Sequence, residues 1–188
     1  MGWIDRYTLE PFDREEHLPL LWEYYADPEQ ACLIGHVRVT SQEGFRNYLD
    51  DRLSRSWADV RVLYNQKGTP VGFGFLHDLR PTSCSVSIAL FRHCRGSGAG
   101  MILAVKMLQH IFATYRVHRV FQWVFDTNQP SLRLHWHAHR RGFLEYHGFL
   151  PDQYVRSGAS HGTHIFSLTR DSFQRDCNAW EGRRTNRR

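Results

Sequence analysis

A glycine-rich run between a predicted strand and a predicted helix constrains this 188-residue chain more than any other feature. The run reads Arg95-Gly96-Ser97-Gly98-Ala99-Gly100. Three glycines let the backbone curl so that several N–H groups point at one place, and the N-terminus of the following helix adds the positive end of its dipole. The run therefore predicts a cradle for a pyrophosphate. A plain glycine-rich turn stays the alternative, because the glycine spacing matches neither a Walker loop nor a dinucleotide-binding fingerprint.

The periodicity on both sides of this run predicts an α+β protein. Cys84–Phe91 alternates and has one aliphatic face, whereas apolar residues recur at helical spacing from Met101 to Tyr115. The other predicted strands are Tyr7–Pro11, Val60–Tyr64, Val71–Leu76, Val120–Phe125, Phe143–Tyr154 and His164–Leu168, and the other predicted helices are Asp13–Tyr25, Ser41–Leu53 and Gln129–Arg141. This order predicts a mixed, mostly antiparallel sheet of about seven strands flanked by about four helices.

The length predicts a single domain. We expect residues 1–178 to form it and the short, basic, apolar-poor residues 179–188 to be a disordered tail. No apolar run is long enough to span a membrane, and the N-terminus has no apolar signal core, which predicts a cytoplasmic protein without a membrane partner. The four cysteines form no CxxC pair, which favours free thiols: Cys32, Cys84, Cys94 and Cys177.

Three features, in the same order along the chain, resemble the GNAT superfamily of N-acetyltransferases. Arg95, Gly98 and Gly100 match the acyl-CoA loop of this family. Asn128 and Ser131 then precede a helix that ends at Gly-Phe, as in the family pattern. The segments 147–150 and 164–168 resemble the last hairpin of the branch that acetylates ribosomal-protein N-termini, polyamines and some antibiotics.

The resemblance implies a single GNAT-like domain in which two neighbouring parallel strands, Cys84–Phe91 and Val120–Phe125, splay apart and hold acetyl-CoA. It implies acetyl transfer to a primary amine by direct attack. The residues that the resemblance implies for acetyl-CoA are Arg95 and the backbone of Gly96, Ser97, Gly98, Ala99 and Gly100 for the phosphates, Asn128 for the pantetheine amides, and Ser131 near the thiol. A backbone N–H near Leu90 or Phe91 is expected to donate to the oxyanion.

The chain departs from the family at the expected base and acid. Ser85 stands where many relatives carry a Glu, and Ala138 stands four residues before Gly-Phe, where many carry a Tyr. Counting forward from Asn128 instead puts His135 at that Tyr position. The candidate replacements are His77, Asp78, His135, Glu145 and Tyr146. We favour His77 as a base acting through a water, and the alternative is that His77 and Asp78 are an ordinary polar pair at a strand end.

A histidine-rich stretch in the helix after Asn128 raises the question of a metal. His135 and His139 share a helix face, but a zinc site needs a third or fourth ligand, and the sequence has no HExxH motif. We therefore expect no metal and predict a solvated, partly substrate-facing helix.

The charge distribution bears on the partner. Residues 1–51 hold eleven acids and four bases, whereas the remainder is basic, and the whole chain has a net charge of +5. An acidic segment favours a cationic acceptor, a small-molecule amine or a protein N-terminus, attracted by residues such as Glu15, Glu16, Glu23, Asp27 and Glu29. The aromatic residues Trp22, Tyr24 and Tyr25 are either cation–π partners for that acceptor or core.

Two other functions stay open from sequence. The first is a non-catalytic acyl-CoA-binding or interaction module with the GNAT fold, which the missing Glu and Tyr favour. The second is a nucleic-acid-binding protein, which the 22 arginines and the sequence pI of about 9.2 favour. Against nucleic acid, the arginines are spread through the chain and no nucleic-acid-binding motif is present. We expect a monomer or a homodimer.

Overall fold

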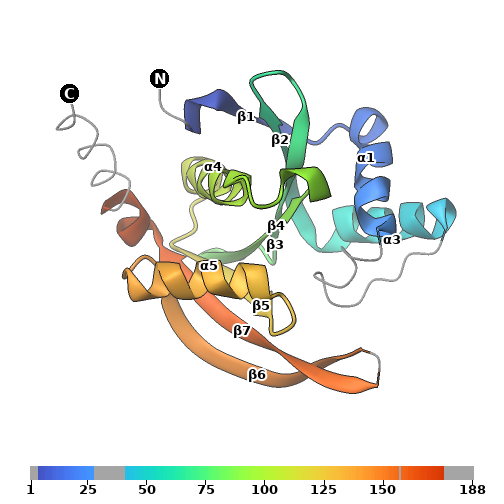
Figure 1. Cartoon of the computed structure of the whole chain (residues 1–188). Helices are drawn as coiled ribbons and strands as arrows, with labels where there is room; N and C mark the ends of the chain where they lie inside the picture. The colour runs from blue at the N-terminus through green and yellow to red at the C-terminus, as the bar shows by residue number, and fades with distance from the viewer. Residues whose placement is uncertain (1–3, 28–40, 157, 176–188) are drawn as a thin grey trace.

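In the computed structural model, residues 4–27, 41–156 and 158–175 are described, and they form one seven-stranded sheet with helices on both faces (Figure 1). The strands are β1 (Tyr7–Pro11), β2 (Trp57–Asn65), β3 (Pro70–His77), β4 (Ser83–Leu90), β5 (Arg119–Phe125), β6 (Glu145–Arg156) and β7 (Ala159–Thr169). The helices are α1 (Arg14–Ala26), α3 (Gln42–Arg55), α4 (Ala99–Thr114) and α5 (Gln129–Arg140), with 3-10 turns η1 (Ile4–Arg6) and η2 (Arg92–Cys94) and a helical segment over residues 170–175. The predicted α+β class is confirmed.

The sheet has the strand order β1-β2-β3-β4-β5-β7-β6. Every neighbouring pair is antiparallel except β4 and β5, which are parallel. A parallel pair needs a crossover connection, and α4 supplies it. The long β6–β7 hairpin reaches beyond the rest of the sheet and curves away from it (Figure 1).

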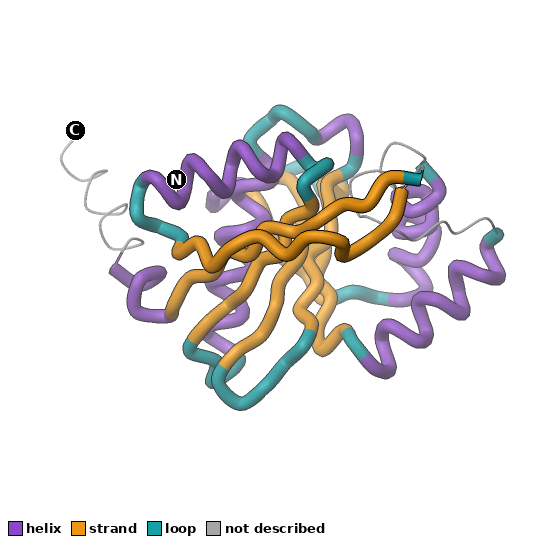
Figure 2. Tube along the Cα trace, turned by 90° about the horizontal axis from the view of Figure 1, so that it is seen from below, coloured by secondary structure: helices purple, strands orange, loops and turns teal. Residues whose placement is uncertain are grey.

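Helices α4 and α5 cover one face of the sheet, and α1 and α3 cover the other; Figure 2 shows helices on both sides of the twisted strands. Val120 and Val124 lie on the same face of β5, because strand residues two apart point the same way. Val120 packs in the α4 core, and Val124 packs against Leu132 of α5. On the opposite face, Phe73 of β3 packs with Phe45 of α3.

Close packing brings α4 onto the sheet at Gly74. A Cβ at this position would lie 2.3 Å from the sulfur of Met107, which is fully buried. Glycine therefore lets α4 sit directly on β3, and α4 in turn fixes the position of the glycine-rich run at its N-terminus. The first two helices are capped at the residues where the predicted helices begin: Asp13 accepts from the N–H of Glu16 at 2.9 Å, and Ser41 Oγ accepts from the N–H of Gly44 at 3.1 Å.

The last hairpin differs from its prediction. The strand expected over Phe143–Tyr154 begins two residues later and continues to Arg156, and β7 runs well beyond the expected His164–Leu168. The extension is stabilised by cross-strand pairing up to Arg156 and Ala159, in a stretch whose polar composition gives little hydropathy signal. The expected tail at residues 179–188, the end of the expected domain at 178, Glu29, Cys32 and Cys177 lie outside the described residues. No helix among the described residues has the length and apolar character needed to cross a membrane.

Candidate active site

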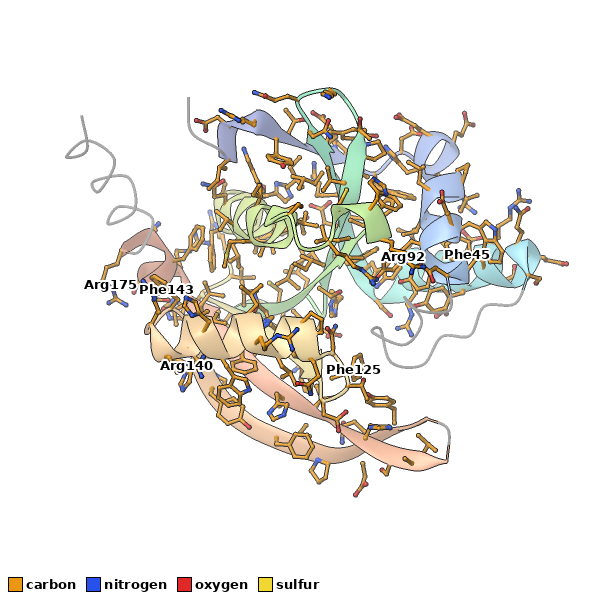
Figure 3. The ribbon with its side chains drawn as sticks, in the orientation of Figure 1. Phe45, Arg92, Phe125, Arg140, Phe143 and Arg175 are labelled. Atoms are coloured by element: carbon orange, nitrogen blue, oxygen red, sulfur yellow. The ribbon has the colours of Figure 1, made fainter. Side chains whose placement is uncertain are left out.

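The two central parallel strands separate after a short paired stretch. β4 and β5 pair only at Ser83 with Arg119, Cys84 with Val120, and Ser85 with Phe121. Beyond these pairs β4 continues to Leu90 and β5 to Phe125 without pairing with each other, and we call the region between these two stretches the opening. Phe125 ends β5 beside the first turn of α5 (Figure 3). The predicted splay of these two strands is present.

Backbone groups of β4 face this opening. The N–H of Phe91 donates to the carbonyl of Val71 on β3 at 3.1 Å. Backbone groups alternate in direction along an antiparallel strand, so those of Ile88 and Leu90 point the other way, toward β5. Of the two expected oxyanion donors, Leu90 is therefore oriented toward the opening, whereas the N–H of Phe91 is committed to β3.

The glycine-rich run lies at the wide end of the opening and leads into α4. Gly96 and Gly98 have φ angles of +73° and +85°, which favour glycine, and a Cβ at either position would meet no atom within 4 Å. Ser97 Oγ donates to the carbonyl of Cys94 at 2.6 Å and accepts from the N–H of Ala99 at 3.3 Å. Within the described chain, no hydrogen bond uses the N–H groups of Gly96, Ser97, Gly98 and Gly100. The run thus presents an open cradle of backbone donors, which suits a pyrophosphate.

Arg95 connects this run to the other face of the sheet. Burial raises the pKa of Tyr24 on α1, and the positive charge of Arg95 partly offsets that rise, so the guanidinium lies close to α1. Phe91 and Cys94 also pack with the core formed by α1 and α3, and Arg92 begins η2 immediately after Phe91 (Figure 3). Contacts with α1 and α3 thereby hold the start of the loop.

The N-terminus of α5 borders the opening on the β5 side. Asn128 caps this helix, because its Oδ1 accepts from the N–H of Ser131 at 3.2 Å. Asn128 and Ser131, which the family pattern assigns to pantetheine and thiol, therefore lie together in the first turn, as expected from their spacing. The cap is a role for Asn128 that the sequence analysis did not assign.

His135 bridges α5 and β5 one helical turn further on. Its Nδ1 lies 2.8 Å from the carbonyl of Ser131, which only accepts, so Nδ1 carries a proton. Its Nε2 lies 2.6 Å from Oε1 of Gln122, the first residue of β5 after the last pair with β4. Because an amide oxygen only accepts, a ring whose single proton is on Nδ1 bonds to Gln122 when the amide is turned by 180° and its NH2 group donates to Nε2. Burial lowers the pKa of His135, and the hydrogen bond to Ser131 opposes this only in part. His135 is therefore neutral at pH 7.

His77 and Asp78 lie at the end of β3. Nδ1 of His77 is 3.3 Å from Oδ2 of Asp78, and Nε2 is 3.2 Å from Oγ of Ser87 on β4. Burial lowers the pKa of His77, the carboxylate of Asp78 raises it, and the positive charge of Arg52 on α3 lowers it further. The side chain of His77 is only 23% exposed, whereas that of Asp78 is 61% exposed. The expected histidine–aspartate pair is formed, and Ser87 joins it.

Ser87 is the member of this group that the sequence analysis missed. It lies on the face of β4 opposite the aliphatic one, and an alternating pattern predicts such a polar face without naming a partner for its side chains. Its partner His77 is ten residues away on the neighbouring strand, so the pairing depends on the β3–β4 register, in which His77 lies opposite Ser85. The sequence alone does not give this register, so it could not identify Ser87 as the partner of His77.

Two candidate residues lie away from the opening. Tyr146 is on β6, which β7 separates from β5, and its hydroxyl lies 3.1 Å from Nδ1 of His164. Its ring packs on Trp136, with 4.6 Å between the centroids, in the small core under α5. Glu145, also on β6, pairs with Arg119. The structure therefore does not bring Tyr146 and Glu145 together with His77 or with the glycine-rich run.

The histidine-rich helix is used for packing and capping. His139 Nδ1 lies 2.9 Å from the carbonyl of Leu144, and His135 is engaged as described above. Among the described residues, no three His, Cys, Asp or Glu side chains are grouped so as to hold a metal ion.

The aromatic residues of α1 belong to the core. Tyr24 and Tyr25 are 4% and 7% exposed, and Trp22 packs on Phe45 with 5.5 Å between the ring centroids. Of the two alternatives for these residues, cation–π partners or core, the structure supports the core. The carboxylates of Glu15, Glu16 and Glu23 are on exposed residues of the same helix.

Comparison with known proteins agrees with this geometry. Residues 6–139 match the family described as the acetyltransferase (GNAT) domain, and the chain therefore belongs to the GNAT acetyltransferases. This membership makes it an N-acetyltransferase by family. A search of curated protein sequences finds no significant match.

Solved structures share the fold at low sequence identity. A spermidine N-acetyltransferase from Vibrio cholerae, in complex with CoA and spermine, superposes with a TM-score of 0.78 at 13% identity, over 90% of this chain and 99% of that one. A spermidine/spermine N-acetyltransferase from the same organism, in complex with manganese ions, gives 0.72 at 12% identity, over 93% and 99% of the two chains. This chain is similar to both in fold.

Proposed function

We propose that this chain transfers the acetyl group of acetyl-CoA to a primary amine, and that the amine attacks the thioester directly. The observation that carries the proposal is the open cradle at Gly96 and Gly98, next to a sheet that opens between β4 and β5. Unused backbone donors and a helix N-terminus suit a pyrophosphate, and the exposed backbone edge at Ile88 suits the amide groups of an extended pantetheine arm. CoA, present in the similar Vibrio cholerae structure, combines both groups.

The residues that would hold acetyl-CoA come from three elements. The backbone from Gly96 to Gly100 would bind the pyrophosphate, β4 would pair with pantetheine at Ile88, and the first turn of α5 would lie by the thioester. Asn128 and Ser131 are both in that turn. A thiolate leaving there is stabilised by the helix dipole and by the Ser131 hydroxyl as a hydrogen-bond donor.

His77 is the base in this proposal. A primary amine has a pKa near about 10, so only its neutral form, roughly one part in a thousand at pH 7, is nucleophilic. A histidine whose pKa is lowered cannot take a proton from the free ammonium at equilibrium. It can take the proton that the nitrogen loses as the C–N bond forms, because the nitrogen then becomes a much stronger acid. The C–S bond breaks, and the sulfur leaves as thiolate.

His135 does not serve as a charged acid in this proposal. An imidazole that is neutral at pH 7, with its N–H directed at a carbonyl, has no proton to give to a thiolate. Its contacts with Ser131 and Gln122 instead fix α5 against β5. His135 is therefore a positioning residue for the first turn of α5.

A cationic amine is the acceptor class we propose. Helix α1, which has exposed carboxylates, packs on the face of the sheet that carries Ser87, and Trp123 of β5 lies on this same face with 46% of its surface exposed. Exposed indole rings and carboxylates attract ammonium groups through cation–π and charge interactions. The spermine in the similar Vibrio cholerae structure is an amine of this class.

Titration calorimetry with acetyl-CoA, followed by a thiol-release assay, tests the function. We expect binding, and release of CoA thiol with at least one member of a panel of polyamines, aminoglycosides and peptides with free N-termini. Tight binding of acetyl-CoA without thiol release from any amine would favour the non-catalytic module. Absence of acetyl-CoA binding, together with salt-dependent binding to nucleic acid, would favour a nucleic-acid-binding protein.

A further inference from the structure

The side chains of Asp78, His77 and Ser87 form a line that runs from the end of β3 to the open part of β4. The distances are 3.3 Å from Asp78 Oδ2 to His77 Nδ1 and 3.2 Å from His77 Nε2 to Ser87 Oγ. Ser87 follows the last residue of β4 that pairs with β5 by two positions, so it lies where the two strands have begun to separate. Ser87 is exposed, whereas His77 is mostly buried behind it. The serine hydroxyl is therefore the accessible end of the line.

The partners define where the protons are. An ionised carboxylate only accepts hydrogen bonds, so the neutral imidazole of His77 places its proton on Nδ1, facing Asp78. Nε2 then has a lone pair, and the Ser87 hydroxyl donates to it. The oxygen of Ser87 keeps its own lone pairs on the exposed side, where an N–H group of a bound amine can donate to them.

The backbone conformation at Asp78 helps to orient its carboxylate toward His77. Asp78 has a φ of +51°, a left-handed conformation that is uncommon for residues other than glycine and that costs about 1 kcal/mol or more. The turn that follows is closed by the N–H of Arg80, which donates to the carbonyl of Ser83 at 2.8 Å. This conformation directs the carboxylate back to the histidine that precedes it in the chain. Among the residues that the structure describes, the other charge that acts on His77 is that of Arg52, from α3.

We propose that the hydroxyl of Ser87 is a catalytic group that passes the proton of the attacking amine to His77. The inference rests on the proposed acetyl transfer and adds a residue to it. As the C–N bond forms and the C–S bond breaks, the nitrogen gives its proton to Ser87 Oγ. Ser87 gives its own hydroxyl proton to His77 Nε2, and Asp78 stabilises the imidazolium. His77 then releases the proton to solvent or to the CoA thiolate, so that amine and acetyl-CoA yield amide and free thiol.

Ser87→Ala removes the relay and leaves His77 in place. We expect kcat/KM to fall by roughly 10²–10⁴-fold, the range of general acid–base catalysis, with the affinity for CoA unchanged in calorimetry. Ser87→Thr, which keeps the hydroxyl, is expected to restore most of the activity. The double variant Ser87→Ala/His77→Gln is expected to be no slower than the slower single variant, because both changes interrupt one path.

Ser85→Ala is the matched control. Ser85 lies on the same face of the same strand, two residues earlier, and is buried. Its backbone is paired with that of His77 in the sheet, but among the described residues no hydrogen bond joins its hydroxyl to the imidazole. We expect it to keep the wild-type rate. A loss as large as that in Ser87→Ala would mean that serine removal disturbs β4 in general, and the relay would be wrong.

The imidazole of His77 offers a readout that does not depend on turnover. Ser87→Ala removes the hydroxyl donor to Nε2 and is expected to change the NMR signal of that nitrogen, whereas Ser85→Ala is expected to leave it unchanged. An unchanged Nε2 signal in Ser87→Ala would show that the hydrogen bond does not form, and would overturn the relay.

The outcomes separate the relay from the proposed function. Wild-type protein that binds acetyl-CoA but releases no thiol with any amine overturns both. Active wild type with a fully active Ser87→Ala variant overturns the relay alone. Mass spectrometry after mixing with acetyl-CoA in the absence of amine is the last check, because an acetylated Ser87 would make the serine a nucleophile and replace the relay by a covalent mechanism.

Discussion

At the residue scale, the two histidines that sequence analysis singled out have different roles because their partners differ. His77 faces a carboxylate and an exposed hydroxyl, so it is poised to take up a proton. His135 faces a backbone carbonyl and an amide, so both ring nitrogens are occupied by groups that hold α5 in place. Burial lowers the pKa of both histidines, so the pKa alone does not separate them. Their hydrogen-bond partners distinguish the proposed base, His77, from the residue that joins α5 to β5, His135.

The first prediction concerns the pH dependence of His77. A base acts in its deprotonated form, so kcat/KM is expected to fall as the pH drops through the pKa of His77, which burial places below the usual 6.5. His77→Gln is expected to abolish this limb and to lower kcat/KM by roughly 10²–10⁴-fold. The limb toward the pKa of the amine, near about 10, is expected to remain.

Asp78→Asn provides the companion measurement. The carboxylate of Asp78 raises the pKa of His77, so its removal is expected to move the acidic limb to still lower pH and to keep the limb itself. Profiles of kcat/KM from pH 5 to pH 9 distinguish the two variants. A wild-type acidic limb that survives in His77→Gln would exclude His77 as the base.

At the element scale, the acetyl-CoA site is built from the ends of elements rather than from their middles. The glycine-rich run joins β4 to α4, and Asn128 joins β5 to α5, so two helix N-termini lie at the same end of two neighbouring parallel strands. Ligands of open sheets commonly bind at this end of a parallel pair. The site therefore depends on the two junctions more than on any one side chain.

The second prediction tests the glycine-rich junction. Gly98→Val introduces a side chain into the open space of the cradle, at a φ of +85°, and is expected to weaken acetyl-CoA binding at least tenfold, or about 1.4 kcal/mol. Calorimetry measures the affinity, and thermal unfolding of the unliganded variant reports the strain separately. A folded variant with the wild-type affinity would contradict the cradle.

The third prediction separates the two roles of Asn128. Asn128→Ala removes the cap of α5 and is expected to lower the free energy of unfolding by about 1 kcal/mol and to weaken binding of acetyl-CoA but not of 3′,5′-ADP, which has no pantetheine. Asn128→Asp keeps a capping oxygen and is expected to retain the stability while still losing affinity for acetyl-CoA. Equal losses for both ligands would restrict Asn128 to supporting the loop.

The features of the site that depend on residues close together in the sequence could be predicted, whereas the contacts between residues far apart in the sequence could not. Glycine spacing and the alternation of apolar residues are visible within a few positions. The run from Arg95 to Gly100 therefore lies between a strand and a helix, as predicted. The pairing of His77 with Ser87 needs the β3–β4 register, and the distance of Tyr146 from the opening needs the insertion of β7 between β5 and β6. Neither follows from the residues close in sequence.

At the scale of the whole molecule, buried neutral histidines link stability to pH. The pKa of His135 and that of His77 are both lowered in the folded protein, so the unfolded chain binds more protons than the folded one at pH values below about 6.5. Their contribution to stability is therefore complete above this pH and is lost as the pH falls. His135 carries the larger structural role, because it joins α5 to β5 and its ring packs 5.2 Å from that of Phe166.

The last prediction follows from this linkage. The free energy of unfolding of the wild-type protein, measured with urea, is expected to be lower at pH 5 than at pH 7.5. His135→Gln is expected to be less stable than wild type at pH 7.5, because it loses the ring packing and the bridge, yet to lose less stability between the two pH values, because glutamine does not titrate. His137→Gln, an exposed neighbour on the same helix, is the control and is expected to follow the wild type at both pH values. If His135→Gln shows the same loss between pH 7.5 and pH 5 as the wild type, the proton uptake on unfolding comes from other groups, and the buried neutral state of His135 is wrong.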